Sequence, residues 1–507
     1  MSKLKIVVIG NGMVGHNFIE KLYQSELKDE IEVSTFSEEP YMAYDRVHLS
    51  SYFSDCNVDS LSLVKGNFYE DNNINIYLDD KVVAVDKENK TLTSAKGKTL
   101  HYDKLIFATG SYPFVPPIKG NDRKNCLVYR TIEDLDDIKE VAKNSKVGVV
   151  IGGGLLGLEA AKALKDLELD THVVEFASRL MPIQLDDGGA GLLKRKIENL
   201  DVKVHLKKVT TKIDDGENHI HKMYFEDEED LETDLIVFSA GIRARDDLAQ
   251  ESGLKIGSRG GIVVDNHCMT SDKDIYAIGE CALWEGQIFG LVAPGYAMAK
   301  VVVDCLNRNP KEFTGADMSA KLKLMGVDVG SIGDPHGSDE NALSYVYENG
   351  PKEIYKKIVV STDSKKLLGA VLVGDTDDYS NLLQIMLNDM DLPEHPDSLI
   401  LPNINGAESN LFGPASLPDN AQICSCFDVV KLDMKKAIDD GAMTMADIKE
   451  QTLASTGCGG CAQLVKDILN FELELKGVEV NNNICEHFDY TRADLYNLVK
   501  IEEIKDF

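Results

Sequence analysis

Two close pairs of cysteines near the carboxyl end of the chain have a spacing that could hold a metal centre. Cys424 and Cys426 form a C-x-C pair, and Cys458 and Cys461 form a C-x2-C pair. The intervening residues carry two helical patterns, so a small helical module can bring the thiolates together. Four thiolates suit a tetrahedral Zn²⁺ or an iron–sulfur cluster, and the spacing alone does not decide between them.

Glycines beside the second pair favour the cluster. Gly457, Gly459 and Gly460 leave backbone N–H groups exposed, and such groups can bond cluster sulfides and shift the potential. The chain has only 10 cysteines in 507 residues, and its first apolar run, LKIVVIG, is expected to be a strand and not a signal peptide. This usage predicts a cytoplasmic location, where clustered cysteines indicate metal or redox chemistry instead of disulfides.

A strand, a glycine-rich turn and a helix follow one another at the start of the chain. Residues 4–9 are a short apolar run, Gly10, Gly12 and Gly15 form a G-x-G-x-x-G pattern, and apolar residues then recur at helical spacing. In a dinucleotide-binding turn the first glycine permits the tight turn, the second admits a pyrophosphate and the third lets helix and strand pack closely. The next strand leads to Glu38, whose carboxylate can accept hydrogen bonds from a ribose.

The same arrangement recurs later in the chain. Residues 146–151 lead into Gly152, Gly154 and Gly157, a helical pattern follows, and the next strand ends at Glu175. One such motif is weak evidence, but two in strand–turn–helix context, each followed by an acid, predict two nucleotide sites. We expect a bound flavin dinucleotide in one site and an exchanging nicotinamide dinucleotide in the other.

Glu175 also bears on the choice of nicotinamide coenzyme. A carboxylate at this position bonds ribose hydroxyls and repels a 2′-phosphate, so the sequence favours NADH over NADPH. Arg179 lies nearby and could weaken that preference.

Two further turns carry a family resemblance. Residues 104–111 are expected to be a strand that ends in a turn at Thr109 and Gly110, and a later strand leads to Gly279 and Glu280. With these segments the chain resembles the two-dinucleotide flavoprotein disulfide reductase superfamily, in the branch of NADH-dependent ferredoxin and rubredoxin reductases. The resemblance implies that the first glycine motif holds FAD and the second holds NAD(P)H.

The same resemblance implies roles for single residues. The turn at Thr109 would close the FAD domain, and Glu280, where aspartate is usual, would contact the ribityl chain of the flavin. Glu38 would take the FAD ribose, and Arg46 would lie against the flavin, with an ordinary surface salt bridge as the alternative for Arg46. No acid–base residue is expected for the hydride step, because flavin and nicotinamide carry that chemistry.

The cysteine module offers an exit for electrons. Many members of the superfamily carry a C-x4-C disulfide beside the flavin, and the early part of this sequence has no such pair. The spacing of the late cysteines resembles the bacterioferritin-associated ferredoxin type of 2Fe–2S domain. This resemblance implies that a 2Fe–2S cluster is held by Cys424, Cys426, Cys458 and Cys461.

Joined to the reductase segments, the module extends the resemblance over nearly the whole chain. The chain resembles the N-terminal part of the large subunit of NAD(P)H-dependent nitrite reductases. The segments that carry this resemblance include AYDRVHLSSYF (43–53), VVIGGGLLGLEAA (149–161), GLVAPGY (290–296) and ICSCFDV (423–429). It implies an NADH-dependent FAD oxidoreductase that passes electrons through the cluster to a sirohaem nitrite-reducing site, in nitrite and nitrate assimilation.

The sequence departs from that family at its carboxyl end. The family's large subunit normally continues into a sirohaem and 4Fe–4S half, and the remaining cysteines of this chain do not have the spacing of that half. We expect either a fragment of a longer subunit or a naturally short electron-transfer subunit that cannot reduce nitrite by itself. Its partner would be a sirohaem nitrite-reducing or nitrate-reducing protein half or subunit.

The predicted fold class is α/β, with two Rossmann-like domains of the two-dinucleotide flavoprotein fold, a small α+β reductase C-terminal domain and a small helical 2Fe–2S module. The expected boundaries are 1–120 and 241–312 for the FAD-binding domain, 121–240 for the NAD(P)H-binding domain, 313–396 for the small interface domain, 397–420 for a linker, 421–476 for the cluster module, and 477–507 for a tail or the start of a further module.

Charge and composition limit the partners. The formal net charge of −31 argues against nucleic acid or an anionic membrane as a partner, since both need a basic surface. No stretch of the sequence is apolar over the roughly 20 residues that a membrane-spanning helix needs. The family resemblance suggests a homodimer built through the small domain.

Other functions remain open from the sequence. One alternative is an electron-transfer subunit of assimilatory nitrate reductase, or a reductase of rubredoxin or ferredoxin. A non-enzymatic alternative is a redox or iron sensor, in which the cysteines report on iron or oxygen, or hold zinc, and the nucleotides are regulatory.

Overall fold

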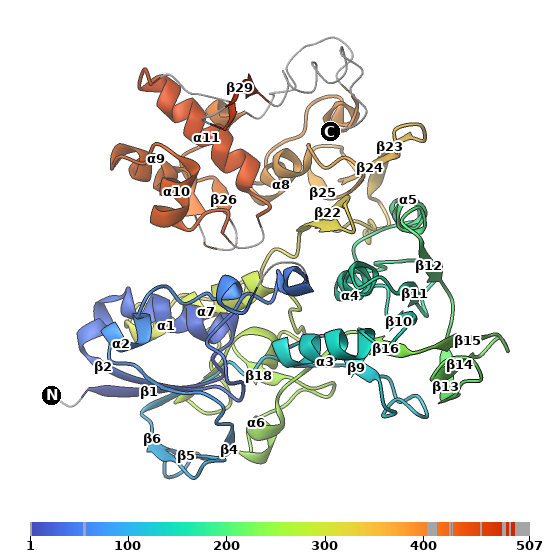
Figure 1. Cartoon of the computed structure of the whole chain (residues 1–507). Helices are drawn as coiled ribbons and strands as arrows, with labels where there is room; N and C mark the ends of the chain where they lie inside the picture. The colour runs from blue at the N-terminus through green and yellow to red at the C-terminus, as the bar shows by residue number, and fades with distance from the viewer. Residues whose placement is uncertain are drawn as a thin grey trace.

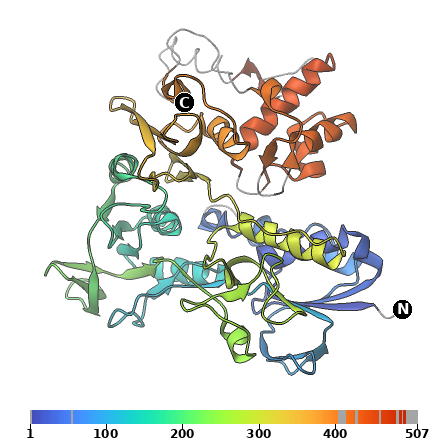
Figure 2. The same ribbon diagram turned by 180° about the vertical axis from the view of Figure 1, so that it is seen from behind.

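Three five-stranded sheets and a helical module organise the part of the chain that the structure describes. The computed structural model describes residues 3–53, 57–402, 413–424, 427, 429–456, 459–478, 483–485 and 488–491. Figure 1 shows the helical module, in red, above the blue first sheet and beside the orange small domain, and Figure 2 shows the same arrangement from behind. No helix within these ranges is long and apolar enough to cross a membrane.

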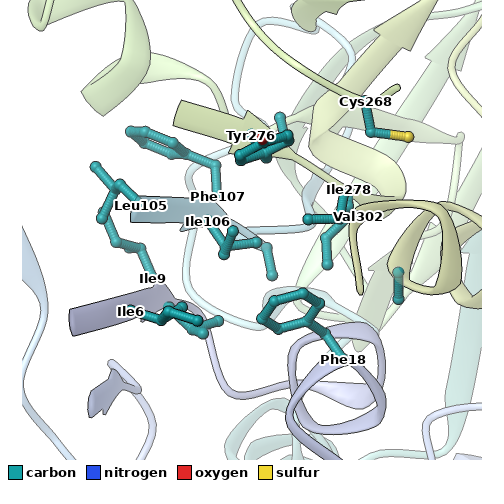
Figure 3. Close-up of a cluster of buried hydrophobic side chains, with 14 of the residues drawn as sticks. Ile6, Ile9, Phe18, Leu105, Ile106, Phe107, Cys268, Tyr276, Ile278 and Val302 are labelled. Atoms are coloured by element: carbon teal, nitrogen blue, oxygen red, sulfur yellow. The ribbon is translucent and has the colours of Figure 1, made fainter. Parts of the chain in front are cut away.

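The first sheet is parallel and carries the first glycine-rich turn at the end of its central strand. Its order β19-β7-β1-β2-β3 joins β1 (Leu4–Ile9), β2 (Ile31–Phe36), β3 (Asn75–Tyr77), β7 (Lys104–Phe107) and β19 (Ile275–Ala277). Helices α1 (Met13–Tyr23) and α7 (Val292–Leu306) pack against each other, and their buried Phe18 and Val302 meet Ile106 (Figure 3). Because β19 and α7 follow the second sheet in the chain, this domain is built from two separate segments of the sequence.

Shorter elements surround the first sheet. They are α2 (Phe68–Asp71), the ribbon β4 (Val82–Asp86), β5 (Thr91–Ser94) and β6 (Thr99–His101), the pair β8 (Ser111–Pro113) and β17 (Ile242–Ala244), the pair β18 (Ile262–Val264) and β20 (Ala282–Trp284), and α6 (Asp247–Glu251). The pair β8–β17 places the chain after Thr109 beside Arg245, which matters for the flavin site.

The second sheet repeats the parallel design. Its order β12-β11-β10-β16-β9 joins β9 (Cys126–Val128), β10 (Val147–Ile151), β11 (Asp170–Val174), β12 (Val202–His205) and β16 (Leu235–Phe238). Around it lie α3 (Ile132–Ala142), α4 (Leu155–Asp166), α5 (Asp187–Glu198) and the ribbon β13 (Thr210–Asp215), β14 (His221–Phe225) and β15 (Asp230–Thr233). The continuous apolar runs in β10 and β16 are typical of strands covered on both faces.

The third sheet is antiparallel and forms the small domain. Its order β21-β22-β25-β24-β23 joins β21 (Ala320–Leu324), β22 (Val327–Gly333), β23 (Leu343–Asn349), β24 (Ile354–Val360) and β25 (Leu367–Val373). Helix α8 (Tyr379–Leu387) packs on β22 and β25, while α5 of the second domain also contacts this sheet. The Tyr355 hydroxyl donates to the Asp186 carboxylate at the start of α5, over 2.7 Å.

The cluster module is a small helical unit with its own core. It consists of β26 (Gln422–Cys424), β27 (Val429–Val430), α9 (Lys431–Asp439), α10 (Met445–Thr452) and α11 (Ala462–Leu475), followed by the hairpin β28 (Asn483–Cys485) and β29 (Phe488–Thr491). Met434, Ile448 and Val465 are fully buried in its core. In the expected linker, Leu399 packs into the small domain and Leu417 into the module, while residues 403–412 lie outside the described residues.

This architecture confirms the predicted fold class. The two parallel sheets with glycine-rich turns, the small α+β domain and the helical module are all present. The carboxyl ends of the parallel strands, where ligands bind in such folds, carry the residues predicted for the two nucleotides.

Candidate flavin, nicotinamide and cluster sites

The first glycine-rich turn is built to leave room in front of a helix. Gly10 has φ +105°, and a Cβ there would lie 2.3 Å from the Ala108 carbonyl oxygen. A Cβ on Gly15 would lie 2.0 Å from the Gly10 carbonyl oxygen, so this glycine is needed for close packing of helix and strand. A Cβ on Gly12 would meet nothing within 4 Å, which leaves open space at the N-terminus of α1. Unpaired N–H groups at such an end can hold a pyrophosphate.

The second turn has the same geometry. Gly152 has φ +122°, and a Cβ there would lie 2.3 Å from the Ser239 carbonyl oxygen. A Cβ on Gly157 would lie 1.9 Å from the Gly152 carbonyl oxygen, whereas a Cβ on Gly154 would meet nothing within 4 Å. Both turns therefore have the cradle that a dinucleotide requires.

A single large cavity joins most of the predicted flavin residues. Its volume is about 570 Å³. The predicted residues that line it are Gly10, Gly12, Glu38, Arg46, Thr109, Gly110, Gly279 and Glu280, so that Gly15, which packs behind the turn, is the one predicted FAD residue outside the lining. The cavity also takes in Leu155, Leu156 and Glu159 at the start of α4, and Cys424 and Cys461 of the cluster module.

A buried polar side chain behind the first turn tests whether the cavity suits a polar ligand. Asn11 lines the cavity and is 4 % exposed, and its Nδ2 has no hydrogen-bond partner. Its Oδ1 accepts from the Tyr69 hydroxyl over 2.7 Å, and the same hydroxyl lies 2.9 Å from His16 Nδ1. Burial lowers the pKa of His16 to about 4, so this imidazole is neutral. An orphaned donor beside the open face of Gly12 fits a phosphate-rich group such as FAD.

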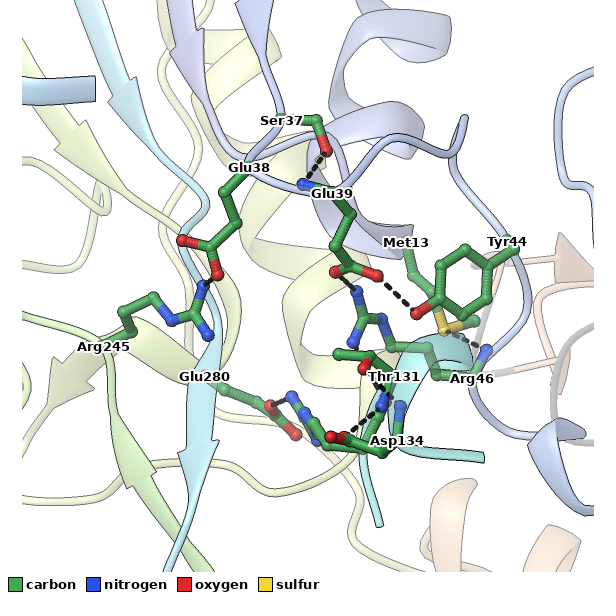
Figure 4. A network of polar contacts seen from close by, with 11 residues as sticks. Met13, Ser37, Glu38, Glu39, Tyr44, Arg46, Thr131, Asp134, Arg245 and Glu280 are labelled. Atoms are coloured by element: carbon green, nitrogen blue, oxygen red, sulfur yellow. Dashed lines mark hydrogen bonds and ion pairs between the residues drawn. The ribbon is translucent and has the colours of Figure 1, made fainter. Parts of the chain in front are cut away.

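Three ion pairs form a polar network along the cavity wall (Figure 4). Arg46 pairs with Glu39, which also accepts from the Tyr44 hydroxyl over 2.7 Å. Arg46 donates a second bond to the backbone oxygen of Arg130 over 3.2 Å. Glu39 therefore holds Arg46 at the cavity, and the ion pair between them is only partly exposed.

The second half of the network holds Glu280. Its carboxylate accepts from the Arg130 guanidinium over 2.6 Å and from the Ser111 hydroxyl over 2.7 Å. The Arg130 Nε is buried without a partner, as is the Arg245 Nε. The acid predicted to contact the ribityl chain thus stands in the cavity with polar groups on both sides.

Glu38 lies at the other end of the same cavity. It forms an ion pair with Arg245 (Figure 4). The Lys81 ammonium lies 3.8 Å from the Glu38 carboxylate. The Thr109 hydroxyl donates to the Arg245 backbone oxygen over 2.6 Å. Glu38, the residue predicted to bind the ribose, is therefore positioned by Arg245. Arg245 directly follows β17 of the pair β8–β17 and lies far along the chain from β2.

The carboxylate of Glu175 accepts hydrogen bonds from backbone N–H groups of the second nucleotide site. It is 4 % exposed, and its oxygens accept from the Gly153 N–H over 2.6 Å and the Ala177 N–H over 2.7 Å. Arg179 is also engaged, since it donates to the Leu185 backbone oxygen over 3.0 Å and to Asp187 over 2.9 Å. The ribose contact of Glu175 stays a prediction.

Glu159 is a charged group in the cavity that the sequence did not single out. It lies on α4 at intermediate exposure, and its buried Oε2 has no hydrogen-bond partner. Burial raises its pKa to about 7, an effect that nearby His48 only partly opposes. His48 itself is 2.7 Å from Asp45, which raises the pKa of that imidazole.

The structure describes half of the predicted cluster ligands. Cys424, at the end of β26, and Cys461, just before α11, are both buried and line the same cavity as the flavin residues. Cys426, Cys458 and Gly457 lie outside the described residues. Two buried thiols brought to one cavity wall from either end of the module fit the thiolate set of a cluster.

Fold and site together define a two-dinucleotide flavoprotein oxidoreductase that carries a cluster module. The chain belongs to the family described as pyridine nucleotide-disulphide oxidoreductase, whose model matches residues 4–305. The rubredoxin NAD+ reductase C-terminal domain matches residues 319–390, and the BFD-like [2Fe-2S] binding domain matches residues 422–470. The protein is thus an FAD-dependent oxidoreductase, and its domains are those that use FAD, NAD and a 2Fe–2S cluster.

Curated relatives cover the whole chain. It is 55 % identical to the nitrite reductase (NADH) large subunit of Escherichia coli K12, over 100 % of this chain and 60 % of that protein. It is 34 % identical to an assimilatory nitrate reductase electron transfer subunit of Bacillus subtilis, over 98 % of this chain and 63 % of that protein. The chain therefore spans less than two thirds of either relative.

Solved structures show the same fold. A ferredoxin reductase from Rhodopseudomonas palustris has a TM-score of 0.70 at 23 % identity, and the match covers 78 % of this chain and 96 % of that one. A NAD-dependent persulfide reductase from A. fulgidus has a TM-score of 0.69 at 25 % identity, covering 78 % of this chain and 80 % of that one.

Sequence reasoning missed several residues of the cavity. Ser111 begins β8, and Arg130 and Arg245 follow the short strands β9 and β17. No local pattern connects these residues with Glu280 or Glu38. Glu159 did give a signal, because it is an acid between apolar residues Leu158 and Ala160 in the helix that follows a glycine turn. An acid on the packed side of such a helix points to a functional group.

Proposed function

We propose that this chain oxidises NADH and passes the electrons, through FAD and a 2Fe–2S cluster, to a sirohaem nitrite-reducing site outside these residues. The observation that carries the proposal is the single cavity lined both by the first glycine-rich turn and by Cys424 and Cys461. A flavin accepts electrons as a pair and can release them singly, which is the chemistry that a cluster relay needs.

The residues of the first site would bind and orient the flavin nucleotide. The N-terminus of α1 and the open face of Gly12 suit the pyrophosphate, with Asn11 as a further donor. Glu38 suits the ribose, and Glu280, held by Arg130, suits the ribityl chain. The remaining predicted FAD residues, Gly10, Gly15, Thr109 and Gly110, would shape this site, and Gly279 would admit the ligand beside Glu280.

The residues of the second site would bind NADH. Gly152, Gly154 and Gly157 form the cradle, and Glu175 stands behind it as the group that disfavours a 2′-phosphate. Arg179, the cation that could have attracted that phosphate, is engaged by Asp187. This arrangement supports NADH over NADPH.

The identity of the electron acceptor is supported by the relatives of this chain and not by its own residues. The large subunits of nitrite reductases match the whole chain, and they extend beyond it, which supports a nitrite-reducing half or subunit as the partner. The nitrate reductase electron transfer subunit of Bacillus subtilis supports a second candidate, a nitrate-reducing partner. We place the reaction in the cytoplasm, where thiols stay reduced.

An EPR measurement tests the relay. The chain is purified anaerobically with FAD and iron–sulfur cluster incorporated, and spectra are recorded before and after addition of NADH. We expect a reduced 2Fe–2S signal only after NADH, and its loss in Cys461→Ser. Bleaching of the flavin without a cluster signal would overturn the relay.

A second assay identifies the acceptor. A separately purified sirohaem nitrite-reducing protein and a nitrate-reducing protein are each mixed with the reduced chain. NADH-dependent consumption of nitrite supports the proposal, and consumption of nitrate alone supports the second candidate.

A further inference from the structure

Helix α8 of the small domain contacts both segments that carry the predicted cluster ligands. Near its first residue, the Ser380 hydroxyl donates to the Gly460 backbone oxygen over 3.1 Å, next to Cys461. Just past its last residue, Asn388 Oδ1 accepts from the Gln422 N–H over 3.0 Å, two residues before Cys424. Figures 1 and 2 both show α8 beside the module, between the small domain and α11.

The Ser380 contact is buried, and the Asn388 contact is part-buried and supported from behind by Gln384. Ser380 is 9 % exposed and Gln384 is 2 % exposed. Asn388 Nδ2 donates to the backbone oxygen and to Oε1 of Gln384, both over 3.0 Å. The amide of Asn388 is therefore oriented so that its oxygen, not its nitrogen, meets the Gln422 N–H.

The helix itself is fixed to the small domain. Leu382 and Ile385 are fully buried in the core that α8 shares with the third sheet. Tyr379, at the first position of α8, lines the cavity that holds the flavin residues and both described cysteines. A shift of α8 would therefore move the cysteine segments relative to the flavin site.

The module does not need these bonds for its own core. Met434, Ile448, Val465 and Ile468 fill that core from α9, α10 and α11. The bonds from Ser380 and Asn388 connect the module instead to a different domain. One is made beside Cys461, and the other is made at the start of β26, the strand that ends at Cys424.

We propose that Ser380 and Asn388 are positioning residues that hold the two cysteine-bearing segments at a fixed separation from the flavin. This inference rests on the proposed relay. Because the rate of electron transfer falls steeply with distance, two hydrogen bonds that remove small movements of the cluster would keep the transfer from flavin to cluster fast. The small domain thereby becomes part of the electron path.

The test compares two steps of the same reaction in the loaded chain. In Ser380→Ala/Asn388→Ala, stopped-flow spectroscopy should show flavin reduction by NADH at the wild-type rate. Reduction of the cluster should be slower by at least about tenfold, the scale expected for a loss of positioning. Ser398→Ala is the matched control, since its hydroxyl also donates to a backbone oxygen, that of His395, but away from the module.

The conservative variants separate positioning from folding. Asn388→Asp keeps an oxygen acceptor for the Gln422 N–H but loses the two bonds that Asn388 donates to Gln384, so it should restore part of the rate of cluster reduction. If the double variant fails to incorporate its cluster, Ser380→Ala alone serves as the test, with a smaller slowing expected. Cluster reduction at the wild-type rate in either alanine variant would overturn the proposal.

A measurement without cofactors keeps this inference distinct from the relay. In the chain free of cofactors, hydrogen exchange of the Gln422 amide should be protected, and Asn388→Ala should remove that protection while Asn388→Asp retains it. Unprotected exchange in the wild-type chain would overturn the positioning role even if NADH reduces the cluster. Protection together with a cluster that NADH never reduces would instead overturn the proposed relay.

Discussion

Gly10 and Gly152 begin turns of nearly the same backbone geometry, and their surroundings differ. At both turns the first glycine has a positive φ and its added Cβ would lie 2.3 Å from a carbonyl oxygen of a neighbouring strand end. The acids that follow are used differently. Glu38 pairs with Arg245 from a distant segment, whereas Glu175 accepts from the N–H of Gly153 in the glycine-rich turn after the neighbouring strand.

The strand register explains part of this difference. Ile9 pairs with Phe36 in the first sheet and Ile151 pairs with Val174 in the second. The residue directly after the strand is Ser37 in the first site and Glu175 in the second, so Glu38 stands one position further out. A site closed by distant segments suits a ligand that stays bound, and a turn whose polar groups are already satisfied suits a ligand that exchanges.

The largest effect is expected when the same substitution, glycine to valine, is made in each of the two turns. Gly12→Val and Gly154→Val should both fold, because a Cβ at either position meets nothing within 4 Å. We expect Gly12→Val to bind FAD at least about 100-fold more weakly, and Gly154→Val to keep FAD but lose about 100-fold in flavin reduction by NADH. Flavin absorbance per chain and stopped-flow rates measure both. Loss of FAD from both variants would contradict the assignment of the turns.

Glu159 tests whether the two regions meet in one cavity. Its folded-state pKa, raised by burial from 4.5 to about 7, means that the folded chain holds the proton more tightly than the unfolded chain. The free energy of unfolding of the cofactor-free chain should therefore fall as pH rises from about 4.5 to 7, by on the order of 3 kcal/mol. In Glu159→Gln this part of the pH dependence should disappear.

Chemical denaturation at several pH values measures the effect. Glu140→Gln is the control, because that carboxylate is exposed and pairs with Lys143 on the surface. If the free energy of unfolding of Glu159→Gln depends on pH as that of the wild-type chain does, the carboxylate lies in solvent. In that case α4 does not line the flavin cavity with a buried acid.

Glu175→Gln tests the hydrogen bonds that Glu175 accepts from the N–H groups of Gly153 and Ala177. An amide has one oxygen in place of the two that accept here and carries no charge, so either the buried N–H of Gly153 or the part-buried N–H of Ala177 loses its partner. We expect a loss of about 2 kcal/mol in the free energy of unfolding. Urea denaturation of the cofactor-free chain measures it. A loss well under 1 kcal/mol would mean that the carboxylate points outward before the ligand binds.

The smallest effect is expected from the same substitution in the first site. Glu38→Gln breaks a partly exposed pair with Arg245, and such pairs contribute less than about 1 kcal/mol. The stability of the cofactor-free chain should hardly change, while FAD binding weakens through loss of the ribose contact. Parallel urea denaturation and flavin titration measure the two. Equal destabilisation by Glu38→Gln and Glu175→Gln would remove the difference between the sites.

Much of the fold could be predicted because its signals are local. The apolar runs at 4–9 and 146–151, each followed by a glycine turn and a helical pattern, are set by short-range backbone geometry. The structure confirms the two sheets that these runs predict. The late return of β19 and α7 to the first sheet could be inferred only from a family resemblance.

The residues of the sites also fall into two groups, those that a short sequence pattern predicts and those that only packing brings together. The residue types at Gly12, Gly154, Cys424 and Cys461 indicate their chemistry wherever the chain takes them. The partners of Glu280 and Glu38 could not be inferred, since Arg130 and Arg245 come from segments far apart in sequence. Glu175 was predicted to face a ribose, and its bonds to the turn depend on side-chain packing that no local pattern encodes.

The sequence by itself determined the two nucleotide turns, the cysteine spacing and the absence of an early C-x4-C pair, because glycine geometry and thiolate chemistry are properties of single residues and short spacings. Tertiary structure alone decided that Cys424 and Cys461 share a cavity with Gly12 and Glu280. It also decided that α8 holds the cysteine segments. Such placements depend on how separately folded units pack, and packing is a sum of many weak contacts between residues far apart in the chain.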